Sequence, residues 1–288
     1  MLNGIDSSIL NEFNEKLYKK FIKAINDYEL IMPNDNICVC ISGGKDSMLM
    51  AKLFQLYKME AKIDFDVTFM VMNPGYNDKN FELILNNLKK LNIDAKIRET
   101  NIFEIAAMQE KSPCYLCAKM RRGALYRLAF DLGCNKIALG HHFDDVIETT
   151  LMNMLNSGSF QTMLPKLHSQ NYEGMELIRP MYLIKEEDVL AWADFNNLNF
   201  IRCACKFTEE NYSCENSNSQ RLNTKRLIKK LKNEIPDIEN NIFNSASNVN
   251  LDKVIGYKLG KQIYTKRKEN LKWEKILKKN YNSFHFLF

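Results

Sequence analysis

The segment at residues 42–47, SGGKDS, combines two glycines with a lysine and an aspartate, between an apolar run at 36–41 and a stretch with helical spacing. Glycines between a buried strand and a helix let several backbone N–H groups point into one concavity, where the helix dipole favours an anion. Lys45 adds a positive charge to the same turn. The segment therefore predicts an anion-binding loop, although its spacing differs from the Walker motif GxxxxGK[ST].

A second polar cluster, GHHFDD at 140–145, directly follows the apolar residues KIAL. If those residues form a strand parallel to the first one, both clusters face the same crevice. Two imidazoles and two carboxylates could hold Mg²⁺, orient a phosphate or transfer a proton. The same residues also fit a plain helix start, with Asp144 or Asp145 as the N-cap.

The cysteines form a third cluster of potential chemistry. Cys114 and Cys117 form a C-x-x-C pair directly before a predicted helix, and Cys203 and Cys205 follow much later. Such a pair joined by a distant cysteine becomes a ligand set. Four thiolates would close a structural zinc site, whereas three thiolates on a [4Fe–4S] cluster would leave one iron open to bind an exogenous sulfur.

These clusters need a scaffold that brings them together. Strand-like and helical segments alternate with short connections from residue 36 onward, which predicts an α/β fold in which helices wrap a parallel sheet. We expect an amphipathic N-terminal helix within 1–30, the α/β domain at 31–205, and a basic helical region at 206–288. The last region has sixteen Lys or Arg against six Asp or Glu from residue 219 onward, so it is a candidate polyanion-binding surface.

Composition narrows the protein class. The chain has 288 residues with 45% hydrophobic content and a net charge of +5, so it can bury a sizeable core. It has no apolar stretch approaching the roughly 18 to 20 residues of a membrane span, and its first residues are polar and acidic. We expect a cytoplasmic protein that makes no membrane contact and whose clustered cysteines serve metal or redox chemistry.

Taken together, the motifs resemble those of the tRNA 2-thiocytidine synthetase (TtcA) family among the PP-loop, or N-type, ATP pyrophosphatases. The resemblance covers roughly residues 20–248. It rests on SGGKDS at 42–47, CYLCAKMRRGALY at 114–126, KIALGHHFDDVIETTLMNML at 136–155 and LIRPMYLIKEED at 177–188.

The resemblance implies a fold of the adenine nucleotide alpha hydrolase type and an ATP site. Asp46 would serve as a catalytic acid or base, or as a ligand of Mg²⁺. The residues that would bind ATP are Ser42, Gly43, Gly44, Lys45, Asp46 and Ser47 in the first loop, and Gly140, His141, Asp144 and Asp145 in the second.

The resemblance also implies a [4Fe–4S] cluster held by Cys114, Cys117 and Cys203, with Cys114 and Cys203 joining Asp46 as catalytic residues. The family's common form around the third ligand reads Pro-Cys-x-x-Cys-Gly-Ser-Gln. This chain instead has Cys203 and Cys205 separated by a single alanine, which leaves Cys205 as the alternative ligand and a four-cysteine site open.

The implied activity is an ATP-dependent, iron–sulfur-dependent tRNA sulfurtransferase that adenylates a pyrimidine C2 oxygen and replaces it with sulfur, as in 2-thiocytidine formation. Its partners would be tRNA and a sulfur donor, either a cysteine desulfurase or sulfide, and a homodimer is compatible with the sequence. The alternatives are a PP-loop thiolase acting on uridine or a small molecule, and a nucleotide-binding zinc or redox regulator without turnover.

Overall fold

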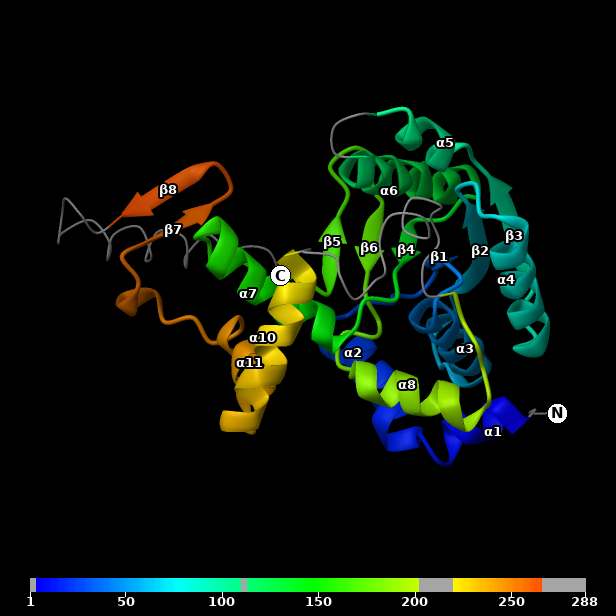
Figure 1. Ribbon diagram of the computed structural model, residues 1–288, viewed down its shortest axis with the longest axis horizontal. Coiled ribbons are helices and arrows are strands. Elements are labelled where there is room, and N and C mark those ends of the chain that lie inside the picture. Colours follow the sequence, from blue (N-terminus) through cyan, green and yellow to red (C-terminus); the bar gives the residue numbers. More distant parts are fainter. Residues whose placement is uncertain (1–3, 110–112, 202–219, 266–288) are drawn as a thin grey trace. The chain divides into compact units, whose positions relative to one another are not determined.

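The computed structural model describes residues 4–109, 113–201 and 220–265 (Figure 1). The chain divides into two compact units, Met1–Phe243 and Asn244–Phe288. The first unit contains a six-stranded sheet, and the second contains a two-stranded hairpin. No helix among the described residues is long and apolar enough to cross a membrane.

The six-stranded sheet has the order β3-β2-β1-β4-β6-β5, and all its neighbours pair in parallel except β5 and β6. From β1 the chain adds β2 and β3 on one side and then returns to place β4 on the other side. The topology therefore switches between β1 and β4, where α/β sheets bind ligands beyond the carboxyl ends of the strands. The strands are β1 (Asn36–Ile41), β2 (Asp66–Asn73), β3 (Ala95–Glu99), β4 (Lys136–Ala138), β5 (Lys166–His168) and β6 (Glu176–Ile178).

Helices cover both faces of the sheet, as the continuous apolar run of β1 predicts. Ile37, Val39 and Ile41 belong to the main core with residues of α2, α3 and α8, while Cys38 and Cys40 pack on the other face with residues of α6. The fold prediction is confirmed. The helices of this scaffold are α2 (Lys19–Asp27), α3 (Lys45–Glu60), α4 (Asp78–Lys90), α5 (Ile102–Ala107), α6 (Pro113–Asp131), α7 (Phe143–Ser157) and α8 (Glu186–Phe195).

The N-terminal segment is broken where a single amphipathic helix is expected. It consists of α1 (Gly4–Leu10), a π-helical segment at Asn14–Tyr18 and α2. Its apolar face is nevertheless buried as expected for an amphipathic segment, because Leu17, Phe21 and Ile25 lie in the main core. The segment is therefore part of the first unit.

The boundary between the units differs from the one expected at residue 205. Helix α10 (Gln220–Glu234) packs against α7, and its Ile228 shares a small apolar cluster with Phe143, Ile147 and Ile242. This burial joins α10 to the first unit. Helix α11 (Ile238–Ser245) follows, and the second unit contains the hairpin of β7 (Gly256–Leu259) and β8 (Gln262–Thr265), where a helical region is expected.

Candidate functional site

The SGGKDS loop lies at the carboxyl end of β1, and its lysine begins α3. Gly43 has a φ of +85°, a left-handed conformation that favours glycine. A Cβ atom at this position would also lie 2.6 Å from Cγ1 of Ile84, so the space is closed to a side chain. The loop therefore takes the strand-to-helix turn that the glycines predict.

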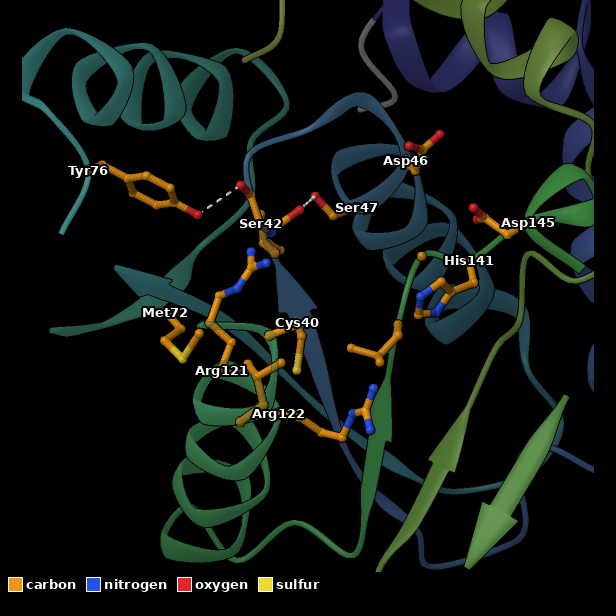
Figure 2. Close-up of a pocket in the computed structure, with 15 residues that line it drawn as sticks. Cys40, Ser42, Asp46, Ser47, Met72, Tyr76, Arg121, Arg122, His141 and Asp145 are labelled. Atoms are coloured by element: carbon orange, nitrogen blue, oxygen red, sulfur yellow. Dashed lines mark hydrogen bonds between the residues drawn. The ribbon is translucent and has the colours of Figure 1, made fainter. Parts of the chain in front are cut away.

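The two serines of the loop are tied to each other. The Ser42 N–H donates a hydrogen bond to Oγ of Ser47 at 3.1 Å, and Ser47 Oγ donates to the carbonyl of Gly44 at 3.0 Å. The hydroxyl of Tyr76, which follows β2, donates to the Ser42 carbonyl at 3.0 Å (Figure 2). These bonds hold the loop in one conformation before any ligand arrives.

The second predicted cluster meets this loop at the topological switch. A Cβ atom on Gly140 would lie 3.1 Å from the carbonyl carbon of Asp46 and 3.1 Å from the backbone nitrogen of Ser47. The connection after β4 therefore touches the first turn of α3, a close approach that glycine permits. The buried His142 then places its Nε2 at 3.7 Å from Oδ1 of Asp46.

A cavity of about 410 Å³ opens where the two loops meet, within the size range of small-ligand sites (Figure 2). Its lining unites the ends of β1 and β4 with helix α6, which supplies two arginines. The lining residues are Cys40, Ile41, Ser42, Asp46, Ser47, Met72, Tyr76, Ala118, Arg121, Arg122, Leu125, Leu139, Gly140, His141 and Asp145.

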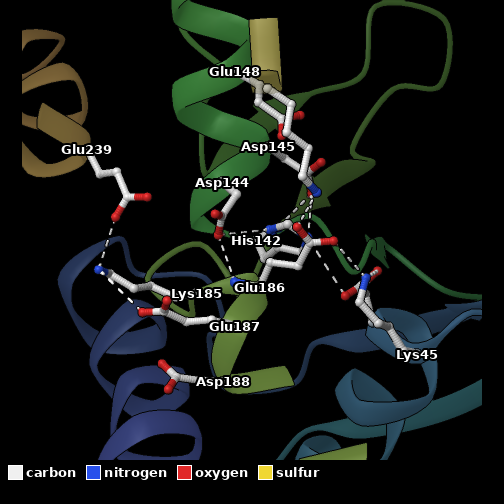
Figure 3. Close-up of polar contacts among 12 residues, drawn as sticks. Lys45, His142, Asp144, Asp145, Glu148, Lys185, Glu186, Glu187, Asp188 and Glu239 are labelled. Atoms are coloured by element: carbon white, nitrogen blue, oxygen red, sulfur yellow. Dashed lines mark hydrogen bonds and ion pairs between the residues drawn. The ribbon is translucent and has the colours of Figure 1, made fainter. Parts of the chain in front are cut away.

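Six of the ten predicted nucleotide-binding residues line this cavity, whereas Gly43, Gly44, Lys45 and Asp144 do not. Asp145 lines the cavity, whereas Asp144 accepts a hydrogen bond at 2.7 Å from the backbone N–H of Glu186, at the start of α8 (Figure 3). The pKa of Asp144 is raised by burial. Burial alone would also raise the pKa of Asp145, but His142 and Arg221 outweigh it and hold that pKa below its usual range.

The side chain of Lys45, within the loop, is held by two carboxylates. Its Nζ lies 3.2 Å from Oδ2 of Asp46 and 3.1 Å from Oε1 of Glu186. Burial would lower the pKa of Lys45, but these carboxylates outweigh it and raise the pKa. Burial would likewise raise the pKa of Glu186, yet the lysines Lys45 and Lys225 lower it to about 2. Lys45 therefore stays cationic and Glu186 anionic at neutral pH.

His141 faces the cavity as a neutral imidazole. Burial, assisted by the nearby guanidinium of Arg179, lowers the pKa of His141 to about 4. The Arg179 Nε–H donates a hydrogen bond to His141 Nδ1 at 3.4 Å. His141 can therefore exchange hydrogen bonds with a ligand without contributing a charge at neutral pH.

Several polar atoms in this part of the described structure lack a hydrogen-bond partner and could bind a ligand. Within the described parts of the chain, the buried atoms Asp46 Oδ1, Arg121 Nε and His142 Nδ1 have no hydrogen-bond partner. Buried polar groups are rarely left unpaired in folded proteins, so such atoms point to a missing partner. A carboxylate and a guanidinium that line one cavity fit a magnesium-bound phosphate, because the first can bind the cation and the second can donate to the anion.

The cysteine cluster is only partly within the described residues. Cys114 and Cys117 lie one helical turn apart at the start of α6. The buried Cys117 packs with Met72. Burial raises the pKa of Tyr76 to about 12, and the nearby Cys117 contributes to this increase. The predicted third ligand, Cys203 or Cys205, lies outside the described residues.

Four residues that the structure places at the site had no predicted role: Tyr76, Arg179, Glu186 and Arg221. For two of them a signal was present. Arg179 and Glu186 stand in LIRPMYLIKEED, which follows a predicted strand, and parallel strands end at one edge of a sheet.

Comparisons with known proteins agree with this geometry. The PP-loop domain family matches residues 11–212. The tRNA-cytidine(32) 2-sulfurtransferase of Syntrophotalea carbinolica is 36% identical over 239 residues, which make up 81% of this chain and 89% of the relative. The protein of that name from Coxiella burnetii is 34% identical, with 85% of this chain and 94% of the relative covered.

A solved structure supports the fold. The U34-tRNA thiolase NcsA from Methanococcus maripaludis, described with its [4Fe-4S] cluster, matches with a TM-score of 0.62 and 21% identity, over 80% of this chain and 76% of that chain. The PP-loop match covers more than half of the chain, and the curated relatives match it over most of their length. The chain therefore belongs to the PP-loop family and, within it, to the family of tRNA-cytidine(32) 2-sulfurtransferases.

Proposed function

We propose that this protein is an ATP-dependent tRNA sulfurtransferase that converts cytidine to 2-thiocytidine at position 32. The observation that carries the proposal is the cavity at the β1/β4 switch, where the unpaired atoms Asp46 Oδ1 and Arg121 Nε accompany the SGGKDS loop. The family membership identifies the substrate class, since the relatives are named for this nucleoside.

The chemistry explains why such an enzyme needs ATP. The C2 oxygen of cytosine is a poor leaving group. Its attack on the α-phosphorus of ATP forms a new P–O bond and breaks the α–β anhydride, so that pyrophosphate leaves and the oxygen carries AMP. A sulfide sulfur then forms a bond to C2, and AMP departs with the oxygen. The enzyme must therefore stabilise negative charge on pyrophosphate and on AMP in turn.

The residues of the two loops suit these demands. The N–H groups at the start of α3 and the ammonium group of Lys45 can stabilise the departing pyrophosphate. We assign the Asp46 carboxylate as a ligand of Mg²⁺, because the residue lines the cavity and its buried Oδ1 has no hydrogen-bond partner among the described residues. The neutral His141 can donate or accept a hydrogen bond at the reacting phosphate.

We further propose that Cys114, Cys117 and Cys203 hold a [4Fe–4S] cluster, with Cys205 as the alternative third ligand. Such a cluster with three protein ligands supplies one iron that can bind a sulfur atom for transfer. The first two cysteines begin α6, and one turn beyond Cys117 the same helix carries Arg121 into the cavity. This spacing along one helix supports a sulfur site close to the proposed nucleotide site.

The tRNA partner requires groups that bind phosphate and bases. Arg121 and Arg122 line the cavity and can bind RNA phosphates, and position 32 belongs to a loop whose bases are more accessible than those of a duplex. A base that is already partly unstacked is cheaper to extrude into a pocket. The sulfur would come from a cysteine desulfurase or from free sulfide.

Analysis of the nucleosides in tRNA incubated with the anaerobically purified protein, ATP and sulfide tests the proposal. Wild-type protein should form 2-thiocytidine. Asp46→Asn should reduce the rate of its formation by at least about a hundredfold, because removing one group that stabilises the transition state electrostatically typically costs that much. Asp64→Asn is the matched control, since the Asp64 side chain is 91% exposed. Equal thiolation by wild type and Asp46→Asn would reject the assigned site.

Iron and sulfide analysis tests the cluster separately. Cys114→Ala should lose bound iron and thiolation together while its melting temperature stays close to that of the wild type. Zinc in place of iron in the wild-type protein, persisting after anaerobic reconstitution, would make the cysteines structural and would reject the cluster.

A further inference from the structure

Helix α10 presents two cations to the carboxylates around the nucleotide site. Arg221 and Lys225 are four residues apart, so they share one face of the helix. The Arg221 Nη2 lies 2.5 Å from Asp145 Oδ1, its Nε lies 2.7 Å from Glu148 Oε2, and Lys225 pairs with Glu186. The burial of Ile228 two turns from Arg221 anchors this face against α7.

Glu186 connects this helix to the anion-binding loop. Its Oε1 accepts a hydrogen bond from Lys45 at 3.1 Å (Figure 3). Its Oε2 contacts Lys225. Lys45 is therefore linked through one carboxylate to a lysine on α10, 180 residues further along the chain. Any change in the charge of Lys225 alters how strongly Glu186 attracts Lys45.

The charge balance explains why the contact matters for a polyphosphate. Four carboxylates, those of Asp46, Asp145, Glu148 and Glu186, contact Lys45, Arg221 or Lys225. Lys45 alone would offset one of these four negative charges, and Arg221 and Lys225 offset two more, which leaves Arg121 and Arg122 of the cavity lining available for phosphates. A triphosphate approaching the loop would otherwise meet strong repulsion, because like charges at short range in a partly buried site are weakly screened.

We propose that Arg221 and Lys225 are positioning residues of the ATP site: they balance the carboxylates that face the loop and leave Lys45 available for the phosphates. Helix α10 then contributes residues to the nucleotide site in addition to forming a basic surface. The inference rests on the proposed function, since it assumes that the loop binds ATP.

Calorimetric titration of the full-length protein with Mg²⁺ and α,β-methylene-ATP, which cannot be cleaved between its first two phosphates, tests this inference without tRNA. Arg221→Gln and Lys225→Gln should each raise the Kd for the analogue by about tenfold, which is typical of the interaction between neighbouring charges in one network. Lys229→Gln is the matched control: it removes the same charge from an exposed position on the same helix and should bind as the wild type does.

Two further variants separate positioning from folding. Arg221→Lys keeps the charge and should restore most of the affinity. Glu186→Gln combined with Lys225→Gln removes both partners and should bind more tightly than Lys225→Gln alone, which a purely structural role for Lys225 would not produce. The melting temperatures of Arg221→Lys, Lys225→Gln and Lys229→Gln should stay close to that of the wild type, whereas the double variant, which loses the Glu186 carboxylate, should melt at a lower temperature.

The outcomes distinguish the inference from the proposed function. If wild-type protein does not bind the analogue, both are rejected. If wild type binds it and Arg221→Gln and Lys225→Gln bind equally well, or if Lys229→Gln loses as much affinity as they do, the role of α10 alone is rejected. Loss of affinity in the two variants with recovery in the double variant supports the inference.

Discussion

The close approach of Gly140 to the first turn of α3 leads to a quantitative prediction for Gly140→Ala. The added methyl group would lie 3.1 Å from the carbonyl carbon of Asp46 and from the nitrogen of Ser47, and ordinary contact begins at 3.4 Å. These are backbone atoms, so relief requires the loop after β4 and the start of α3 to separate by about 0.3 Å. The substitution therefore displaces the two halves of the proposed ATP site with only a small change in stability.

The expected magnitude follows from this displacement. A misplacement of 1 Å lowers the rate by roughly a hundredfold, so about 0.3 Å should lower kcat/KM for ATP by about fourfold. This factor corresponds to about 0.8 kcal/mol of lost transition-state stabilisation. Pyrophosphate release in the presence of tRNA measures it, and thermal melting measures the accompanying loss of stability, which should be about 1 kcal/mol.

A second glycine provides the matched control. Gly123 lies inside α6, and a Cβ atom built there has no heavy atom within 4 Å. Gly123→Ala should leave pyrophosphate release unchanged and should stabilise the protein by roughly 0.5–1 kcal/mol, because alanine favours a helix over glycine. Unchanged kinetics in Gly140→Ala, or an equal loss in Gly123→Ala, would refute the argument from close approach.

Two further predictions concern buried charges. Lys136→Met should destabilise the protein by about 3–5 kcal/mol, because it leaves two carboxylates without their shared buried cation. The Lys136 ammonium group lies 2.7 Å from Asp35 and 3.0 Å from Glu176. Urea unfolding measures the free energy, and a loss below about 1 kcal/mol would contradict this prediction. Glu186, whose pKa of about 2 lies below the ordinary value near 4.3, should stabilise the wild type relative to Glu186→Gln above about pH 4, and this advantage should shrink as the pH falls to 2. Parallel stability curves for the two proteins between pH 6 and pH 2 would show that Glu186 has no such role.

Much of the scaffold was predictable because its signals are local. The apolar run of β1 and the helical spacing of α3 indicated a buried strand followed by a helix, and both are present. The meeting of the SGGKDS and GHHFDD segments was also predictable, since the carboxyl ends of parallel strands share one edge of the sheet.

The second unit was harder to predict. Its hairpin contains lysines among its apolar residues, and its strands are mostly exposed, so the alternation of buried and polar positions that marks a strand is weak there. Gly260, with a φ of +59°, forms the turn of this hairpin. The structure therefore has an antiparallel hairpin where the sequence predicted part of a basic helical region.

The sequence by itself determined the backbone of the site. Glycine at position 43 allows the positive φ of the loop, glycine at position 140 allows the close approach, and the apolar runs before them form the strands that hold both loops. Such features depend on the conformational preferences of a few neighbouring residues, and these preferences can be read from the chain directly.

Only the tertiary structure decided how the charges of the site are arranged. Asp144 and Asp145 are neighbours in sequence, yet one accepts a hydrogen bond from the start of α8 and the other lines the cavity. Arg221 reaches Asp145 across 76 residues because Ile228 packs its helix against α7. Contacts of this kind depend on how the helices pack, and the packing energy is a sum over many distant residues that no local pattern contains.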